Sequence, residues 1–257
     1  MLEIKNVHKS FNARTVNETE VFDGFSLSVE RGEFVSVVGS NGSGKTTLLN
    51  LISGSVDPDE GKIVLNGREL SALPEHKRAR YAGRVFQDPA AGTVPGMTIA
   101  ENLAIADNKG NRYGLSAGLN KKRLSAYRGM LAELGLGLED KMGMEVGALS
   151  GGQRQALALV MCSMSDIELL LLDEHTAALD PKTSQVIMTL TDKIIKQKGV
   201  TTVMVTHNLK YAVEYGSRLL MLDKGQVVLD KRGEDKVNTK VEDILSIFNK
   251  ISVECGN

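Results

Sequence analysis

A glycine-rich segment near residue 40 has the composition of a phosphate-binding loop. It matches the pattern G-x-x-x-x-G-K-[ST] and consists of Gly39, Ser40, Asn41, Gly42, Ser43, Gly44, Lys45 and Thr46. Glycines let successive backbone N–H groups turn toward phosphate oxygens, because no Cβ stands in the way. Lys45 adds a positive charge near the β- and γ-phosphates, the Thr46 hydroxyl is a candidate Mg²⁺ ligand, and Thr47 assists at the phosphates. The segment predicts a nucleoside triphosphate site, with a plain glycine-rich turn as the alternative.

Two adjacent acids, Asp173 and Glu174, follow an apolar run at residues 169–172. Acids in this position can hold Mg²⁺ and a water molecule at the carboxyl edge of a sheet. Because side chains alternate along a strand, we assign Asp173 to the metal and Glu174 to the attacking water, as a general base. A solvated strand end explains the pair equally well when it stands alone. Together with the phosphate-binding loop, the pair predicts hydrolysis.

A second glycine-rich string, LSGGQ at residues 149–153, is more discriminating. Phosphate-loop enzymes in general have no need for it, and it resembles the signature of ABC ATPases. In that family the string lies at a helix N-terminus and binds the γ-phosphate of an ATP held by the opposite subunit. The resemblance gives this role to Ser150, Gly151, Gly152 and Gln153. The alternative is an N-capped helix that begins Ser-Gly-Gly.

Four further residues occur in the order expected for ABC ATPases. Gln87 resembles the Q-loop glutamine, which contacts Mg²⁺ and the attacking water. His207 resembles the switch histidine, which donates a hydrogen bond to the γ-phosphate and orients Glu174. Asp180 resembles the D-loop aspartate at the dimer interface, and Phe11 stands where an aromatic ring stacks on adenine. Taken alone, Gln87 is a polar strand end, Asp180 a helix N-cap and His207 a structural residue.

Two positions depart from the common pattern of the family. His175 follows Glu174 where Pro is usual, and Ala178 stands where Ser is common. The sequence gives no physical reason for His175. Residues 12–20 look like an extended loop that can reposition the segment around Phe11.

Short β-type runs and helical patterns surround these motifs and predict the elements that position them. Apolar strands at 169–172 and 200–206 flank a helix at 182–198, which is the alternation of a parallel sheet buried on both faces. We also expect strands at 2–7, 25–29, 34–38 and 63–65, a helix that ends at Gly54, helices at 121–134, 151–164 and 241–251, and a hairpin across residues 223–225.

The resemblance implies an α/β fold of the ABC-ATPase type: a P-loop NTPase (RecA-like) core, an antiparallel β subdomain and a helical signature subdomain. The expected core with its β subdomain covers residues 1–88 and 166–230. The helical subdomain is expected at 89–165 and a C-terminal tail helix within 231–257.

Composition excludes several other classes of protein. Lys and Arg number 31 against 32 Asp and Glu, so nothing in the charge indicates nucleic-acid binding. Two cysteines, Cys162 and Cys255, form neither a disulfide framework nor a metal-ligand spacing. The longest apolar runs fall far below the roughly 20 residues that span a bilayer, and the first residues contain no apolar signal core. We therefore expect a soluble, cytosolic chain.

The resemblance implies an ATP- and Mg²⁺-dependent ATPase subunit of an ABC transporter. One cassette implies a dimer, with a second copy or a close paralogue, in which two ATP sites are shared. A separate membrane permease would dock near residues 88–97 and hold the subunit on the cytoplasmic face. The single-cassette layout resembles bacterial uptake systems, which usually add an extracellular substrate-binding protein. The strings at 84–103 and 170–183 are similar to ATPases of tryptophan/tyrosine-type amino-acid uptake systems.

Other functions remain as alternatives. An ATPase for export or lipoprotein release uses the same catalytic residues. A soluble ABC factor acting on ribosomes or DNA typically has two cassettes or a long coiled coil, and this sequence has one cassette and no heptad run. An ordinary P-loop kinase or GTPase would leave LSGGQ without a role.

Overall fold

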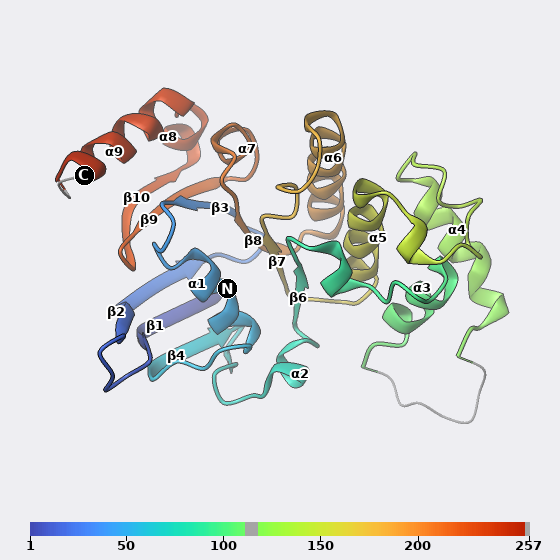
Figure 1. Ribbon diagram of the computed structural model, residues 1–257, viewed down its shortest axis with the longest axis horizontal. Coiled ribbons are helices and arrows are strands. Elements are labelled where there is room, and N and C mark those ends of the chain that lie inside the picture. The colour runs from blue at the N-terminus through green and yellow to red at the C-terminus, as the bar shows by residue number, and fades with distance from the viewer. Residues whose placement is uncertain (111–117, 255–257) are drawn as a thin grey trace.

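The computed structural model describes residues 1–110 and 118–254, with two sheets and a group of helices arranged along the long axis (Figure 1). The strands are β1 Leu2–Phe11, β2 Thr19–Val29, β3 Phe34–Gly39, β4 Glu60–Leu65, β5 Arg68–Glu69, β6 Ala82–Val85, β7 Leu169–Asp173, β8 Thr201–Val205, β9 Arg218–Asp223 and β10 Gln226–Arg232. The α-helices are α1 Lys45–Ser53, α2 Glu75–Arg78, α3 Ile99–Asp107, α4 Leu124–Ala132, α5 Gly151–Ser163, α6 Pro181–Lys198, α7 Leu209–Glu214, α8 Gly233–Val237 and α9 Val241–Glu254.

The N-terminal strands form an antiparallel sheet in the order β2-β1-β4-β5. β1 and β2 pair along their whole length, from Leu2 opposite Val29 to Phe11 opposite Thr19. The prediction of an extended loop over residues 12–20 is therefore wrong for its last two residues, which belong to β2. Only residues 12–18 form the turn. Thr19, Glu20 and Asp23 are exposed, and Phe22 is the only buried residue before Phe25, so the sequence pattern does not mark this first part of β2 as a strand.

The central sheet has six strands in the order β10-β9-β3-β8-β7-β6. β3, β6, β7, β8 and β9 run parallel to their neighbours, and β10 returns antiparallel in the expected hairpin. Every residue of β3, β7 and β8 is buried, which is why these strands read as continuous apolar runs. One face packs with α1 and the antiparallel sheet, and the other packs with α5 and α6. β10 ends at Arg232, two residues beyond the boundary expected at 230.

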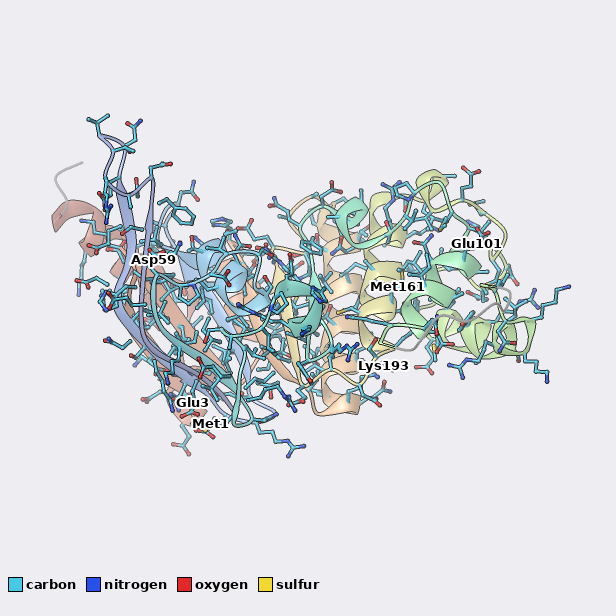
Figure 2. All side chains as sticks on the ribbon, turned by 90° about the horizontal axis from the view of Figure 1, so that it is seen from below. Met1, Glu3, Asp59, Glu101, Met161 and Lys193 are labelled. Carbon is cyan, nitrogen blue, oxygen red and sulfur yellow. The ribbon has the colours of Figure 1, made fainter. Side chains whose placement is uncertain are left out.

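The helices α3, α4 and α5 gather at the other end of the molecule around their own apolar cluster (Figure 1). Leu103, Tyr127 and Leu157 are buried in it. The helix expected at 121–134 is a 3₁₀ turn at Lys121–Arg123 followed by the shorter α4. Glu101 and Met161 lie at this helical end in Figure 2, far from Met1 and Asp59, which directly precede β1 and β4.

The chain ends in α8 and α9, which pack beside α7 and β9. α9 begins at Val241 as expected and continues to Glu254. Ile244 is buried against Ala212 and Leu219, so one face of the helix is anchored to the core. Cys255 lies outside the described residues. Over the described ranges, none of the helices combines the length and the apolar character that crossing a membrane requires.

Candidate functional site

The phosphate-binding loop connects β3 to α1, as the sequence predicts. Gly44 is the N-cap of α1 and has φ of 100°, a left-handed conformation that favours glycine. A Cβ at this position would lie 2.9 Å from Cζ of Phe22, so only glycine fits between the loop and β2. Ser40 Oγ donates to Asp223 Oδ1 at 3.2 Å, and Ser43 O accepts from the Gly225 N–H at 3.2 Å. The β9–β10 turn therefore supports the loop from outside.

Lys45 is the most enclosed charge of the loop, with 5% of the residue exposed. Its Nζ donates to Gly39 O at 2.8 Å and to Ser40 O at 2.7 Å. Burial lowers the pKa of Lys45, and the negative charge of Glu174 acts in the opposite direction. The loop and the end of β7 thus face each other. Thr46 is exposed and Thr47 half-buried, both in the first turn of α1, while Asn41 and Gly42 are exposed at the tip of the loop.

The carboxyl ends of β3, β7 and β8 meet at one edge of the sheet. Val205 pairs with both Asp173 and Val37, so the strands are in register there. Glu174 follows with φ of 46°, which is uncommon for a residue that is not glycine. Its Oε1 lies 2.7 Å from His207 Nε2. The structure therefore brings together the two residues that the sequence nominates for water activation and its orientation.

A cavity of about 390 Å³ opens beside this pair. It is lined by Glu174, His207 and the segment that leads into α6, including Thr176 and Leu179. The Glu174 side chain is 13% exposed and His207 is 48% exposed. The acid is shielded, while the imidazole remains accessible to a ligand that enters from the edge of the sheet.

Asp173 makes an ion pair that the sequence analysis did not foresee. Its Oδ2 accepts from Arg84 Nη2 at 2.5 Å. Arg84 lies on β6, the neighbour of β7, and Nη1 of the same guanidinium donates to Asn50 Oδ1 of α1 at 2.8 Å. These residues meet because β6 and β7 are neighbours in the sheet, and a local sequence pattern does not predict which strands are neighbours.

The signature string begins α5 in the way that the alternative interpretation describes. Ser150 is the N-cap, its Oγ accepts from the Gln153 N–H at 3.3 Å, and Gln153 Oε1 accepts from the Ser150 N–H at 3.3 Å. This capping box satisfies two N–H groups of the first turn. The cap does not exclude a ligand role, because the N-terminus of α5 stays exposed at Ser150 and Gly151.

Gly152 also has a packing reason within one chain. A Cβ there would lie 2.2 Å from Cγ2 of Thr183, so α5 and α6 touch at this glycine. Asp180 is the N-cap of α6 and accepts from the Thr183 N–H at 3.1 Å, and Pro181 is the first helical residue. The helix-start interpretation of Asp180 is thus correct for local structure. The signature and the D-loop segment begin two helices that are packed together.

Three nominated residues make no described hydrogen bond or ion pair with Lys45, Asp173, Glu174 or His207. Gln87 is exposed two residues beyond β6, and Gln155 Nε2 of α5 donates to the neighbouring Phe86 O at 3.1 Å. Phe11 ends β1, half-buried, with Lys9 Nζ 5.5 Å from its ring centre. No described hydrogen bond or ion pair joins Ser150 to the phosphate-binding loop.

His175 is buried, and the structure supplies the reason that the sequence lacks. Its Nε2 lies 3.1 Å from Thr191 Oγ1 of α6. Burial lowers the pKa of His175 to about 4, so the imidazole is neutral near pH 7. The residue after Glu174 is therefore tied to α6 through a side-chain hydrogen bond.

The chemistry of the nominated metal ligands suits Mg²⁺. Thr46 offers a hydroxyl, Gln87 an amide and Asp173 a carboxylate, and all three bind through oxygen. Mg²⁺ prefers oxygen ligands and is usually held by one or two carboxylates together with substrate phosphates and water. The set fits a metal that arrives with a nucleotide.

Comparisons with known proteins agree on one relationship. Residues 22–177 match the sequence profile of a family described as ABC transporter. A tyrosine transport ATP-binding protein of Clostridioides difficile (strain R20291) is 49% identical, over 96% of this chain and 98% of the relative. A xylose/arabinose import ATP-binding protein of Sulfolobus acidocaldarius is 32% identical, over 98% and 95%. An ATP-binding cassette solved as a dimer in a post-hydrolysis state with ADP and Pi superimposes with a TM-score of 0.77, at 30% identity, over 90% of this chain and 98% of that one.

Proposed function

The chain belongs to the ABC transporter family, and from this premise we propose that it hydrolyses ATP to power a membrane importer for a small solute such as an amino acid. The predicted family, the α/β fold class and the ATPase activity are confirmed by the family match and by the cassette structure. The residue roles, the metal, the direction of transport and the substrate are our proposals.

The observation that carries the catalytic proposal is the 2.7 Å contact between Glu174 Oε1 and His207 Nε2. In the proposed reaction the Glu174 carboxylate accepts a proton from the attacking water, while His207 keeps that carboxylate in one orientation. Lys45 gives up its bonds to Gly39 O and Ser40 O and stabilises the phosphates. Thr46, Gln87 and Asp173 would hold Mg²⁺, which would supply positive charge to offset that of the phosphates.

The second half of each ATP site comes from another copy or a close paralogue in this proposal. Ser150, Gly151, Gly152 and Gln153 lie at the exposed start of α5 and offer a helix N-terminus to the γ-phosphate. Asp180 starts the helix packed beside them and faces the same interface. Phe11 stacks on the adenine ring from the end of β1. The solved relative is itself a dimer.

The transport proposal rests on the relatives. The C. difficile protein is named for tyrosine transport, and the S. acidocaldarius protein is named for sugar import. With 49% identity along nearly the whole chain, we favour an amino-acid importer. A permease docks near residues 88–97, where Val94 and Met97 are exposed apolar residues. The subunit then lies on the cytoplasmic face, and an extracellular binding protein supplies the solute.

Changing Glu174 to Gln tests the catalytic proposal. We expect ATP binding to stay intact and turnover to fall by roughly a hundred-fold or more, because the variant lacks the general base. Phosphate release and ATP affinity are measured on the same purified sample. Glu133→Gln, an exposed acid after α4, is the matched control and should hydrolyse ATP normally. Normal turnover by the Glu174 variant would refute the assignment.

Copurification tests the transport proposal. The tagged Glu174→Gln chain is isolated from its native membranes with ATP, and the proteins that accompany it are identified. A permease, together with loss of labelled tyrosine or tryptophan uptake in cells that carry only this variant, supports the importer. A permease without a defect in tyrosine or tryptophan uptake overturns the assignment of those substrates, and ribosomes without a permease indicate a soluble ABC factor.

A further inference from the structure

Arg84 lies between the acid at the end of β7 and the helix that follows the phosphate-binding loop. β6 and β7 run in parallel with Arg84 opposite Leu171, and Asp173 is the next residue of β7 on the same face. The guanidinium holds Asp173 Oδ2 at 2.5 Å and Asn50 Oδ1 at 2.8 Å. Asn50 belongs to α1, the helix that begins with Lys45. One side chain thus links the acid at the end of β7 to the helix behind the phosphate-binding loop.

The ion pair is shielded from water on both sides. The side chains of Arg84 and Asp173 are 11% and 12% exposed. At such burial the main effect of each charge is to compensate its partner, because a lone charge there is strongly unfavourable. Asp173 therefore has a fixed cation beside it before any metal arrives.

The hydrogen bonds of Arg84 differ from those of the other buried arginines. Arg78 Nε donates to Leu73 O, and Arg218 Nε donates to Asp230 Oδ1. Arg84 Nε is buried with no partner among the described residues, and the Phe86 ring lies 4.9 Å from Arg84 Cζ. A buried donor without a partner calls for an explanation. Here the explanation is that the guanidinium is oriented to hold the Asp173 carboxylate, which leaves Nε without an acceptor.

We propose that Arg84 is a positioning residue that holds the Asp173 carboxylate in place until Mg²⁺ arrives and lowers the affinity of the site for that metal. The inference rests on the metal role of Asp173 in the proposed function. A positive charge next to the carboxylate opposes a divalent cation. The phosphates of ATP bring the negative charge that offsets Arg84, so the site takes the metal together with ATP rather than alone.

The test compares ATP affinity in EDTA with ATP affinity in excess Mg²⁺, by calorimetry on the full chain. The affinity in Mg²⁺ divided by the affinity in EDTA reports how strongly the ATP-bound protein favours the metal. We expect Arg84→Gln to raise this ratio about ten-fold, because the competing charge is gone. Arg84→Lys should keep the ratio within about two-fold while kcat falls, because an ammonium lacks the fixed fork with which Nη1 and Nη2 reach Asn50 and Asp173 separately.

Arg68→Gln is the matched control. Arg68 pairs with Glu168 at 3.1 Å near the same sheets, and its side chain is 41% exposed. Its loss removes one positive charge from the chain without touching Asp173, so the ratio should not change. A second readout needs no nucleotide: in EDTA, Arg84→Gln should lower the Tm, and adding Asp173→Asn should restore part of it, because the uncompensated carboxylate is then removed.

Asp173→Asn separates this inference from the proposed function. If it abolishes the effect of Mg²⁺ while Arg84→Gln leaves the ratio unchanged, the role of Arg84 is overturned and the metal role of Asp173 stands. If Asp173→Asn leaves the ratio at the wild-type value, both fail. Arg84→Met fills a similar volume and gives the same test should the glutamine variant not fold.

Discussion

The nitrogen atoms of His175 have one defined arrangement in the folded protein. Thr191 Oγ1 donates its only hydrogen to Ile187 O at 2.8 Å, so toward His175 it must accept. His175 Nε2 therefore carries a hydrogen and donates it to Thr191 Oγ1. Burial keeps the imidazole neutral near pH 7. Because this residue follows Glu174 directly, the hydrogen bond holds the backbone beside the proposed general base against α6.

We expect this histidine to make the protein sensitive to acid. The pKa of His175 is about 4 in the folded chain, against 6.5 as its ordinary value. The unfolded chain therefore takes up a proton that the folded chain refuses, and the free energy of unfolding falls as pH drops below 6.5. The loss reaches about 3 kcal/mol near pH 4. Urea unfolding in EDTA, without nucleotide, measures it at a series of pH values.

The matched variants are His175→Gln and His76→Gln. Glutamine does not titrate. The free energy of unfolding of His175→Gln should therefore lack the loss of about 3 kcal/mol that the wild type shows near pH 4. His76 is exposed, and its replacement should leave the pH dependence as it is. Parallel curves for wild type and His175→Gln would contradict the assignment of the acid sensitivity to this residue.

The contact between α5 and α6 leaves no room for a side chain at Gly152. A Cβ at Gly152 would lie 2.2 Å from Thr183 Cγ2, so Gly152→Ala must push the two helices apart. We expect it to destabilise the protein by about 1 to 3 kcal/mol, as overpacking does. Gly129→Ala is the control within α4, where an added Cβ meets nothing within 4 Å, and it should stabilise by about 0.5 to 1 kcal/mol. Urea unfolding of both variants measures the opposite signs, and equal effects would contradict the packing argument.

The elements differ in how well the sequence predicts them. The phosphate-binding loop and the buried strands β3, β7 and β8 are local patterns of residue type, so the sequence predicts them with their boundaries nearly correct. The full length of β2 depends on pairing with β1 rather than on an apolar alternation, and the sequence misses it. The Arg84–Asp173 pair and the His175–Thr191 bond join residues 89 and 16 positions apart. Only the packing of strands and helices brings such residues together, so the spacing of residues in the sequence does not predict these contacts.

At the scale of the whole molecule, the two halves of the proposed ATP site lie on different parts of the chain. The phosphate-binding loop belongs to the central sheet, while the signature begins α5 in the helical group. We expect the Glu174→Gln chain to dimerise with ATP, as measured by light scattering. Adding Ser150→Arg should keep it monomeric, because the long charged side chain fills the composite site. Ser125→Arg, at an exposed serine of α4, should still dimerise, and a dimer of the Ser150 variant would count against the shared site.

The bonds of Lys45 place its ammonium group before any nucleotide arrives. Because Nζ is held by Gly39 O and Ser40 O, the side chain already lies folded back over the loop. An incoming phosphate then replaces two carbonyl oxygens instead of ordering a long free side chain, so less side-chain conformational entropy is lost when ATP binds.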